Sequence, residues 1–368
     1  PCAYRFLIIC ASDQLTHHSG GVSAAAAIAP PPAPPTPLAQ NQTTAPSCSR
    51  ISRYAQTESH PFQADGDVNL AQMELILHFT LTSAIPEVDE SLAASVTELI
   101  SQKCLEEPYL LCQIMAISSR HLAIERPQHY QGYFRQAVQL QSKGIQLFQK
   151  SQTSERDGHV AAMLYSSILN RHCLVDALAN RGGDFPSFLH RFIQYTRLKK
   201  GSRILTAESW RRLRQSELSP LLEWGTLDLE LPTRGHDCDQ LRSLISTTSG
   251  LTPVARESCR AAMHYIQLGL DQVANATPTR NTYQMAFSWC IFIPDQYCAQ
   301  LEQLNPAAIA ILGWYAILLH HARHLWQIGD AGVFVLGAVR EYLGAEWAHW
   351  LEGPNAAISQ QSLSNTSI

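Results

Sequence analysis

The sequence predicts an all-α protein, an irregular multi-helix bundle preceded by a disordered linker rich in proline and alanine. Hydrophobic residues make up 45% of the 368 residues, which is enough for a sizeable core. Apolar residues recur at spacings of three and four over most of 69–354, and no run of alternating β-branched residues indicates a sheet. The segment 19–49 is mostly Ala, Pro, Gly, Ser and Thr, and buries too little apolar surface to offset its ordering entropy.

The first half of the periodic region predicts five helices. The first follows Asn69, a suitable N-cap, and ends before Pro86. Its predicted buried stripe consists of Leu70, Met73, Leu77 and Leu81. Pro108 opens the third helix at a position where its missing N–H costs nothing. The other three are predicted at 89–103, 130–148 and 157–179.

The second half continues as shorter helices with no further linker. They are predicted at 185–195, 207–213, 238–246, 253–273, 306–326, 331–343 and 345–351. We therefore expect one helical domain over 67–354. Residues 1–66 are expected to hold the linker, and 355–368 to form a disordered tail.

Charge, cysteines and hydropathy each exclude a class of function. A net charge of −4 gives the chain no strong field for nucleic acid. The ten cysteines contain no C-x-x-C pair, so no complete zinc site is evident. The longest apolar stretch, 307–319, is shorter than the roughly 20 residues of a membrane helix, so we predict no membrane span.

Three phrases, in order, carry a resemblance to a known family. MELILHFT at 73–80 is similar to the opening helix of the fungal-specific transcription factor domain of zinc-cluster regulators, in the sterol uptake control protein-like branch. AISSRHLA at 116–123 resembles that family's Ala-x-Ser-Ala-x-His-Leu-Ala helix, with Ser119 in place of its second alanine. The order of tryptophans, prolines and glycines from Trp289 to Trp347 also fits, although Gly353-Pro354 stands where the family has Trp-Pro.

The resemblance implies a nuclear regulator of RNA polymerase II transcription and no enzymatic activity. It implies DNA binding through a six-cysteine zinc cluster, control by transcriptional co-regulators, and a hydrophobic ligand such as a sterol. The chain begins without Met, and Cys2 in PCAYR has the form of the last ligand of such a cluster. We therefore expect zinc in the intact protein and none in this chain. Residues 5–60 show no heptads, which leaves homodimerisation open.

Two groups of residues are candidates for binding. An apolar ligand site between helices is predicted from Met115, Trp289, Trp314, Leu318, Trp326 and Phe334, although such residues more often form a packed core. A basic patch for phosphates or an acidic partner is predicted from Arg197, Lys199, Lys200, Arg203, Arg211, Arg212 and Arg214, although such runs are more often a solvated face.

Two other functions remain open from the sequence alone. One is a helical ligand-binding or scaffold protein with no role on DNA. The other is a helical metal-dependent enzyme, since His320 and His324 lie four apart on the predicted helix 306–326 and share one face. No Glu stands between them as a general base, so the metalloprotease motif is absent.

Overall fold

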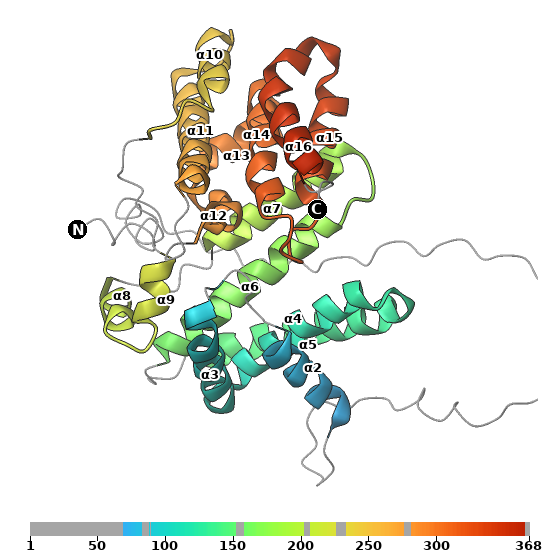
Figure 1. Cartoon of the computed structure of the whole chain (residues 1–368), viewed down its shortest axis with the longest axis vertical. Coiled ribbons are helices and arrows are strands. Elements are labelled where there is room, and N and C mark those ends of the chain that lie inside the picture. The colour runs from blue at the N-terminus through green and yellow to red at the C-terminus, as the bar shows by residue number, and fades with distance from the viewer. Residues whose placement is uncertain are drawn as a thin grey trace, which may run out of the picture. The chain divides into compact units, whose positions relative to one another are not determined.

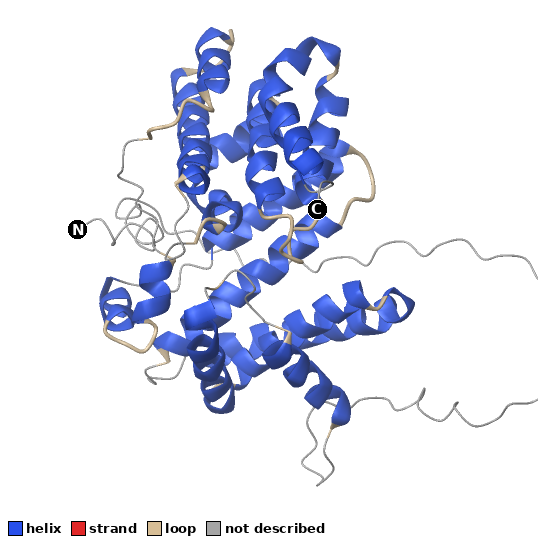
Figure 2. Cartoon of the chain, viewed as in Figure 1, coloured by secondary structure: helices blue, strands red, loops and turns tan. Residues whose placement is uncertain are grey.

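The described part of the chain is helical in its regular structure. The computed structural model describes residues 69–82, 88, 90–151, 158–201, 207–225, 233–275 and 281–364. These residues contain fifteen α-helices and no strand (Figure 2). The predicted all-α class is therefore confirmed, whereas the predicted linker at 1–66 lies outside the described residues.

The helices before residue 225 lie close to their predicted positions (Figure 1). Their bounds are α2 Leu70–Leu81, α3 Glu90–Glu106, α4 Pro108–Glu125, α5 Tyr130–Ser151, α6 His159–Ala179, α7 Phe185–Gly201 and α8 Ala207–Arg214. A short 3₁₀ turn, Pro127–His129, joins α4 to α5, and these two helices pack closely along their length. The short helix α9, Ser219–Trp224, was not predicted.

The later helices include three more differences from prediction. Their bounds are α10 Asp239–Thr247, α11 Pro253–Ala274, α12 Gln284–Phe292, α13 Asp295–Glu302, α14 Pro306–His321, α15 Ala331–Leu343, the 3₁₀ segment Ala345–Leu351 and α16 Glu352–Ser364. Helices α12 and α13 were not predicted, because each is too short to show a clear period. The predicted helix 306–326 ends at His321, and turns follow as far as Asp330.

The prediction of a disordered tail from residue 355 is wrong for 355–364. These residues form most of α16, which packs on α14, and Ile358 is buried in the same core as α14. The segment is largely polar, so few apolar side chains mark the helix in the sequence.

Prolines and short polar side chains set several helix starts. Pro108, Pro253 and Pro306 each occupy the first turn of a helix, where no backbone N–H is needed. The Thr252 hydroxyl accepts from the N–H of Ala255, and the Asn305 amide oxygen accepts from the N–H of Ala307. These caps fix where α11 and α14 begin.

Helix α6 joins the two main hydrophobic clusters. Its first half, with Ala161, Leu164 and Ile168, packs in a cluster with α3, α4, α8 and Phe79 of α2. Its second half, with Leu174 and Leu178, belongs to a larger cluster formed with α7 and α10 to α16. The domain is therefore built along one helix, which is green in Figure 1.

Helix α2 buries a different face from the one predicted. Leu75 and Phe79 are its buried residues, whereas Leu70 and Leu81 are 76% and 80% exposed. Met73 and Leu77 are exposed as well, so the whole predicted stripe faces away from the core. Apolar residues occur all around this helix, and periodicity alone does not select the face that packs.

The described part of the chain contains no single helix long and apolar enough to cross a membrane. Helices α13 and α14 together pass by length and composition, but they are bent by 111° at the break between them. The seven cysteines in the described ranges all carry reduced thiols, and six of them are buried.

Candidate functional site

Two histidines from different sequence phrases meet between α2 and α4. His78 of α2 and His121 of α4 approach to 3.0 Å between Nε2 and Nδ1. His78 belongs to MELILHFT and His121 to AISSRHLA. The two phrases that suggested a family are therefore in contact, and imidazole nitrogens form that contact.

Glu125 and Thr82 complete the group at either end. Nε2 of His121 lies 3.4 Å from Oε1 of Glu125, four residues later on α4, and Nδ1 of His78 lies 3.2 Å from Oγ1 of Thr82. Oε2 of Glu125 also lies 3.8 Å from Nε2 of His78. We call His78, Thr82, His121 and Glu125 the histidine cluster.

One pattern of neutral imidazoles satisfies the histidine cluster. In it, Thr82 donates to Nδ1 of His78, Nε2–H of His78 donates to Nδ1 of His121, and the proton of His121 lies on Nε2, 3.4 Å from Oε1 of Glu125. The reverse pattern would leave a lone pair of His121 at that distance from a carboxylate oxygen. With both rings neutral, each imidazole therefore carries its proton on Nε2.

Burial supports the neutral state of both rings. Desolvation lowers the pKa of His121 to about 4, outweighing the nearby Glu125 carboxylate. It also lowers the pKa of His78, despite the opposing charges of Glu125 and Glu74. Neutral imidazoles carry a free lone pair, which is the form that accepts a hydrogen bond or binds a metal.

Trp326 covers the ring of His121. The two rings stack with centroids 4.3 Å apart and planes 15° from parallel. Trp326 lies in the turns after α14, so this contact brings the C-terminal half of the chain onto α4. The earlier end of α14 thus places Trp326 beside the histidine cluster.

A salt-linked group borders the histidine cluster. Arg126 donates to Glu74 at 2.6 Å and to the Tyr133 hydroxyl at 2.7 Å, and its guanidinium lies over the Tyr133 ring. The Glu74 carboxylate is thereby paired, whereas Glu125 is not held by an arginine in this group. Counting Glu74, Arg126 and Glu125, the local formal charge is negative.

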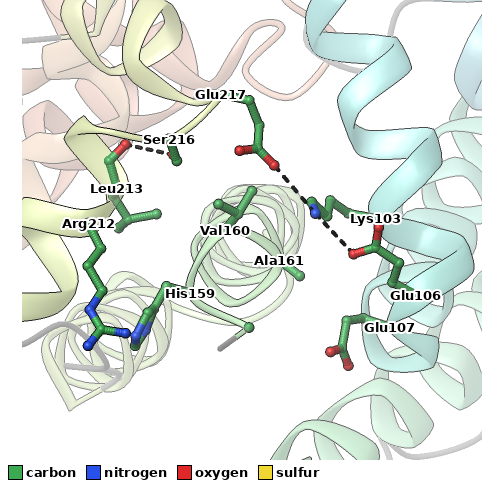
Figure 3. A pocket seen from close by; sticks show the side chains of 11 residues that line it. Lys103, Glu106, Glu107, His159, Val160, Ala161, Arg212, Leu213, Ser216 and Glu217 are labelled. Atoms are coloured by element: carbon green, nitrogen blue, oxygen red, sulfur yellow. Dashed lines mark hydrogen bonds and ion pairs between the residues drawn. The ribbon is translucent and has the colours of Figure 1, made fainter. Parts of the chain in front are cut away.

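A second feature is a polar cavity of about 440 Å³ at the start of α6 (Figure 3). Lys103 lies between two carboxylates there, 3.0 Å from Glu106 and 3.4 Å from Glu217. The wall of the cavity is formed by Lys103, Glu106, Glu107, Gly158, His159, Val160, Ala161, Arg212, Leu213, Ser216 and Glu217. Acidic and basic groups are nearly balanced around this cavity, which does not suit a sterol-like molecule.

The structure does not bring the six predicted ligand-binding residues together. Met115 packs with Leu75 and Leu122 in a small cluster, and Trp326 packs against the cluster around the start of α6. The other four, Trp289, Trp314, Leu318 and Phe334, belong to or pack on the large core. None of the six lines the polar cavity or a second cavity of about 400 Å³ beside Trp347 and Trp350.

The predicted basic patch is divided. Arg197 of α7 forms a two-fold ion pair with Glu302 of α13, which neutralises its charge. Arg211, Arg212 and Arg214 lie on α8, where Arg212 contributes to the polar cavity. Lys199 and Lys200 continue α7, and Arg203 lies outside the described residues, as does the predicted zinc ligand Cys2.

The alternative histidine pair does not share a helical face as predicted. His320 lies in the last turn of α14, but the helix ends at His321, so His324 lies in the turns that follow. The rings of His321 and His324 both contact Tyr283, whereas the His320 side chain is buried. In the described ranges, only His78, His121 and Glu125 form a group of three side chains that a metal can bridge.

His78 and His121 both belong to the sequence phrases described above, but their contact was not predicted. Glu125, four residues after His121, provides the one local signal, because positions i and i+4 share a helical face. The pairing with His78 depends on the packing of α2 on α4. Neither a protein-family model, nor a curated protein, nor a solved structure matches this chain.

Proposed function

We propose that this chain is the helical regulatory domain of a zinc-cluster transcription factor that acts in the nucleus. The proposal draws on the resemblance of three ordered phrases and on one observation, the contact of His78 with His121. Two segments 43 positions apart, each chosen for its similarity to the family, form one packed site. If the two phrases resembled the family only by chance, as unrelated amphipathic helices can, there would be no reason to expect them to be in contact.

In this proposal the domain controls transcription through its partners, and DNA is bound by a separate zinc cluster. The net charge of −4 and the pairing of Arg197 with Glu302 support a protein partner over a phosphate backbone for this domain. The six residues predicted to bind a ligand are spread over three apolar clusters, so in this packing they do not form one ligand site. Ligand or partner binding shifts the population of helix packings.

A tethering assay tests the proposal. The chain is fused to an unrelated DNA-binding domain and expressed in a fungal nucleus with a reporter gene that carries the matching sites. We expect reporter expression to change several-fold relative to the DNA-binding domain alone. A matched fusion with Gly332→Val, which disrupts the packing of α15 on α14, should lose the effect.

Two further measurements bear on the same proposal. The untethered chain should show no sequence-selective binding to DNA, and the coding sequence ahead of Pro1 should contain paired C-x-x-C motifs flanked by Lys and Arg. An unchanged reporter with a folded, nuclear fusion, together with no such coding sequence, would refute the proposal.

A further inference from the structure

We propose that the histidine cluster is a binding site for a divalent transition metal of the zinc class, which links α2 to α4. The inference goes beyond the regulatory function and does not depend on it. It also differs from the sequence-based expectation that this chain binds no metal. The ligands are His78, His121 and Glu125, whose donor atoms all lie within 4.8 Å of one another.

The spacing of the donor atoms matches one bound ion. Ligands at the usual zinc distances in a tetrahedral arrangement are about 3.3 Å apart. Nε2 of His78 lies 3.0 Å from Nδ1 of His121 and 3.8 Å from Oε2 of Glu125. The third donor distance, between His121 and Glu125, also lies within 4.8 Å, so adjustments of these three side chains place three ligands around one ion, and solvent can reach the fourth position beside the half-exposed Glu125.

A surrounding contact supplies the outer partner that a metal-bound histidine requires. With a metal between the two rings, His78 carries its proton on Nδ1 and donates to Thr82. His121 binds through Nδ1 and keeps its proton on Nε2. Binding thus needs small side-chain shifts, a change of tautomer at His78 and a rotation of the Thr82 hydroxyl, and both imidazoles stay neutral.

The choice of metal follows from the ligand type and the surroundings. Imidazole nitrogens favour Zn²⁺, Ni²⁺ and Cu²⁺ over Mg²⁺ and Ca²⁺, which prefer oxygen ligands. The negative local charge attracts a cation, because Arg126 is paired with Glu74 and leaves the charge of Glu125 uncompensated. Trp326, stacked on His121, holds the ring in place and limits access from one side.

The test is metal binding by the full chain after treatment with a chelator. Zn²⁺ is titrated against a chromophoric competitor, and Co²⁺ is followed by its visible absorption. We expect one equivalent of Zn²⁺ at micromolar affinity or tighter, and no competition by millimolar Mg²⁺. His78→Gln and His121→Gln should weaken binding by more than roughly 100-fold, and Glu125→Gln by about 10–100-fold.

His236→Gln is the matched control. His236 lies 3.1 Å from Asp239 and forms a histidine–carboxylate pair on the surface, with its side chain 87% exposed. This variant should bind Zn²⁺ as the unmodified chain does. Circular dichroism checks that every variant is folded.

A measurement on the unmodified chain guards against variants that fail to fold. Zn²⁺ should protect His78 and His121, and not His236, from modification by diethylpyrocarbonate, as mapped by mass spectrometry. The proposal is wrong if the unmodified chain shows no saturable Zn²⁺ binding. It is equally wrong if His78→Gln and His121→Gln bind as tightly as the control, or if Zn²⁺ protects neither histidine.

Discussion

The Nε of Arg120 donates to Oδ1 of Asp176 at 2.8 Å, and the two side chains differ widely in exposure, at 3% for Arg120 and 35% for Asp176. The pair joins α4 to α6, and the guanidinium also lies over the ring of Phe134. The arginine is therefore desolvated, whereas the aspartate keeps part of its hydration. This difference in exposure determines which of the two side chains costs more stability when it is replaced.

Asp176→Asn should destabilise the protein more than Arg120→Met. The first change leaves a buried guanidinium without its counter-charge, a situation that costs about 3–5 kcal/mol. The second leaves a carboxylate that water can reach and fills the space of the arginine stem with apolar atoms. Urea denaturation of the three proteins measures the difference, and equal or reversed costs would contradict the expectation.

His172 should make the domain less stable in mild acid. Its ring is buried, Nδ1 lies 3.3 Å from the Gln113 amide nitrogen, and Nε2 lies 3.7 Å from Asp176. Burial lowers the pKa of His172 below its ordinary value of 6.5, against the opposing charge of Asp176 and with the help of Arg120. The folded chain thus resists a proton that the unfolded chain accepts.

The sign of the pH effect follows from this difference. Above pH 7 both states are neutral at His172 and stability is complete, whereas below about pH 6.5 the unfolded state gains protons and stability falls by up to about 1.4 kcal/mol per pH unit. His172→Gln should lose this part of the slope. Free energies of unfolding of both proteins between pH 5 and 8 test it, and parallel curves would count against it.

The contrast between α4 and α2 explains how much of the fold was predictable. Pro108 and regular apolar spacing marked α4 within a few residues. Helix α2 was located correctly, but Leu75 and Phe79 are buried in place of the predicted Leu70 and Leu81. Position along the chain depends on local signals, whereas the buried face depends on which neighbour packs against it.

The same distinction applies to the histidine cluster. The histidine in each phrase and the four-residue spacing of His121 and Glu125 could be identified from the sequence. The contact with His78 and the stacking of Trp326 join segments far apart in the chain. Trp326 was predicted to lie on a helix with Trp314, and only the early end of α14 moves it to α4.

Gly332→Ala should be costly although it lies inside a helix. An added Cβ at Gly332 would lie 2.6 Å from the carbonyl oxygen of Ala316 and 2.6 Å from the backbone nitrogen of His320. Helix α15 must therefore move away from α14, and overpacking of this kind costs about 1–3 kcal/mol. Differential scanning calorimetry should show a lower Tm.

Gly337→Ala is the matched control on the same helix. Nothing lies within 4 Å of a Cβ added there, so the gain in helix propensity, about 0.5–1 kcal/mol, should raise the Tm. Equal effects of the two substitutions would show that α14 and α15 are not in close backbone contact.

Tyr315→Phe should destabilise the large core through the loss of one hydroxyl. Tyr315 stacks on Trp289 with centroids 4.3 Å apart, and its buried hydroxyl donates to the carbonyl of Ala286 at 2.5 Å. The substitution keeps the ring but removes the hydrogen bond that ties α14 to α12, at a cost of about 1 kcal/mol.

Tyr342→Phe is the control for this substitution. Tyr342 is 38% exposed and stacks on Phe185 without such burial, so the loss of its hydroxyl should change the stability by close to zero. Guanidinium denaturation compares the two, and a Tyr315→Phe chain as stable as the control would mean that this hydrogen bond contributes nothing to holding α12 against α14.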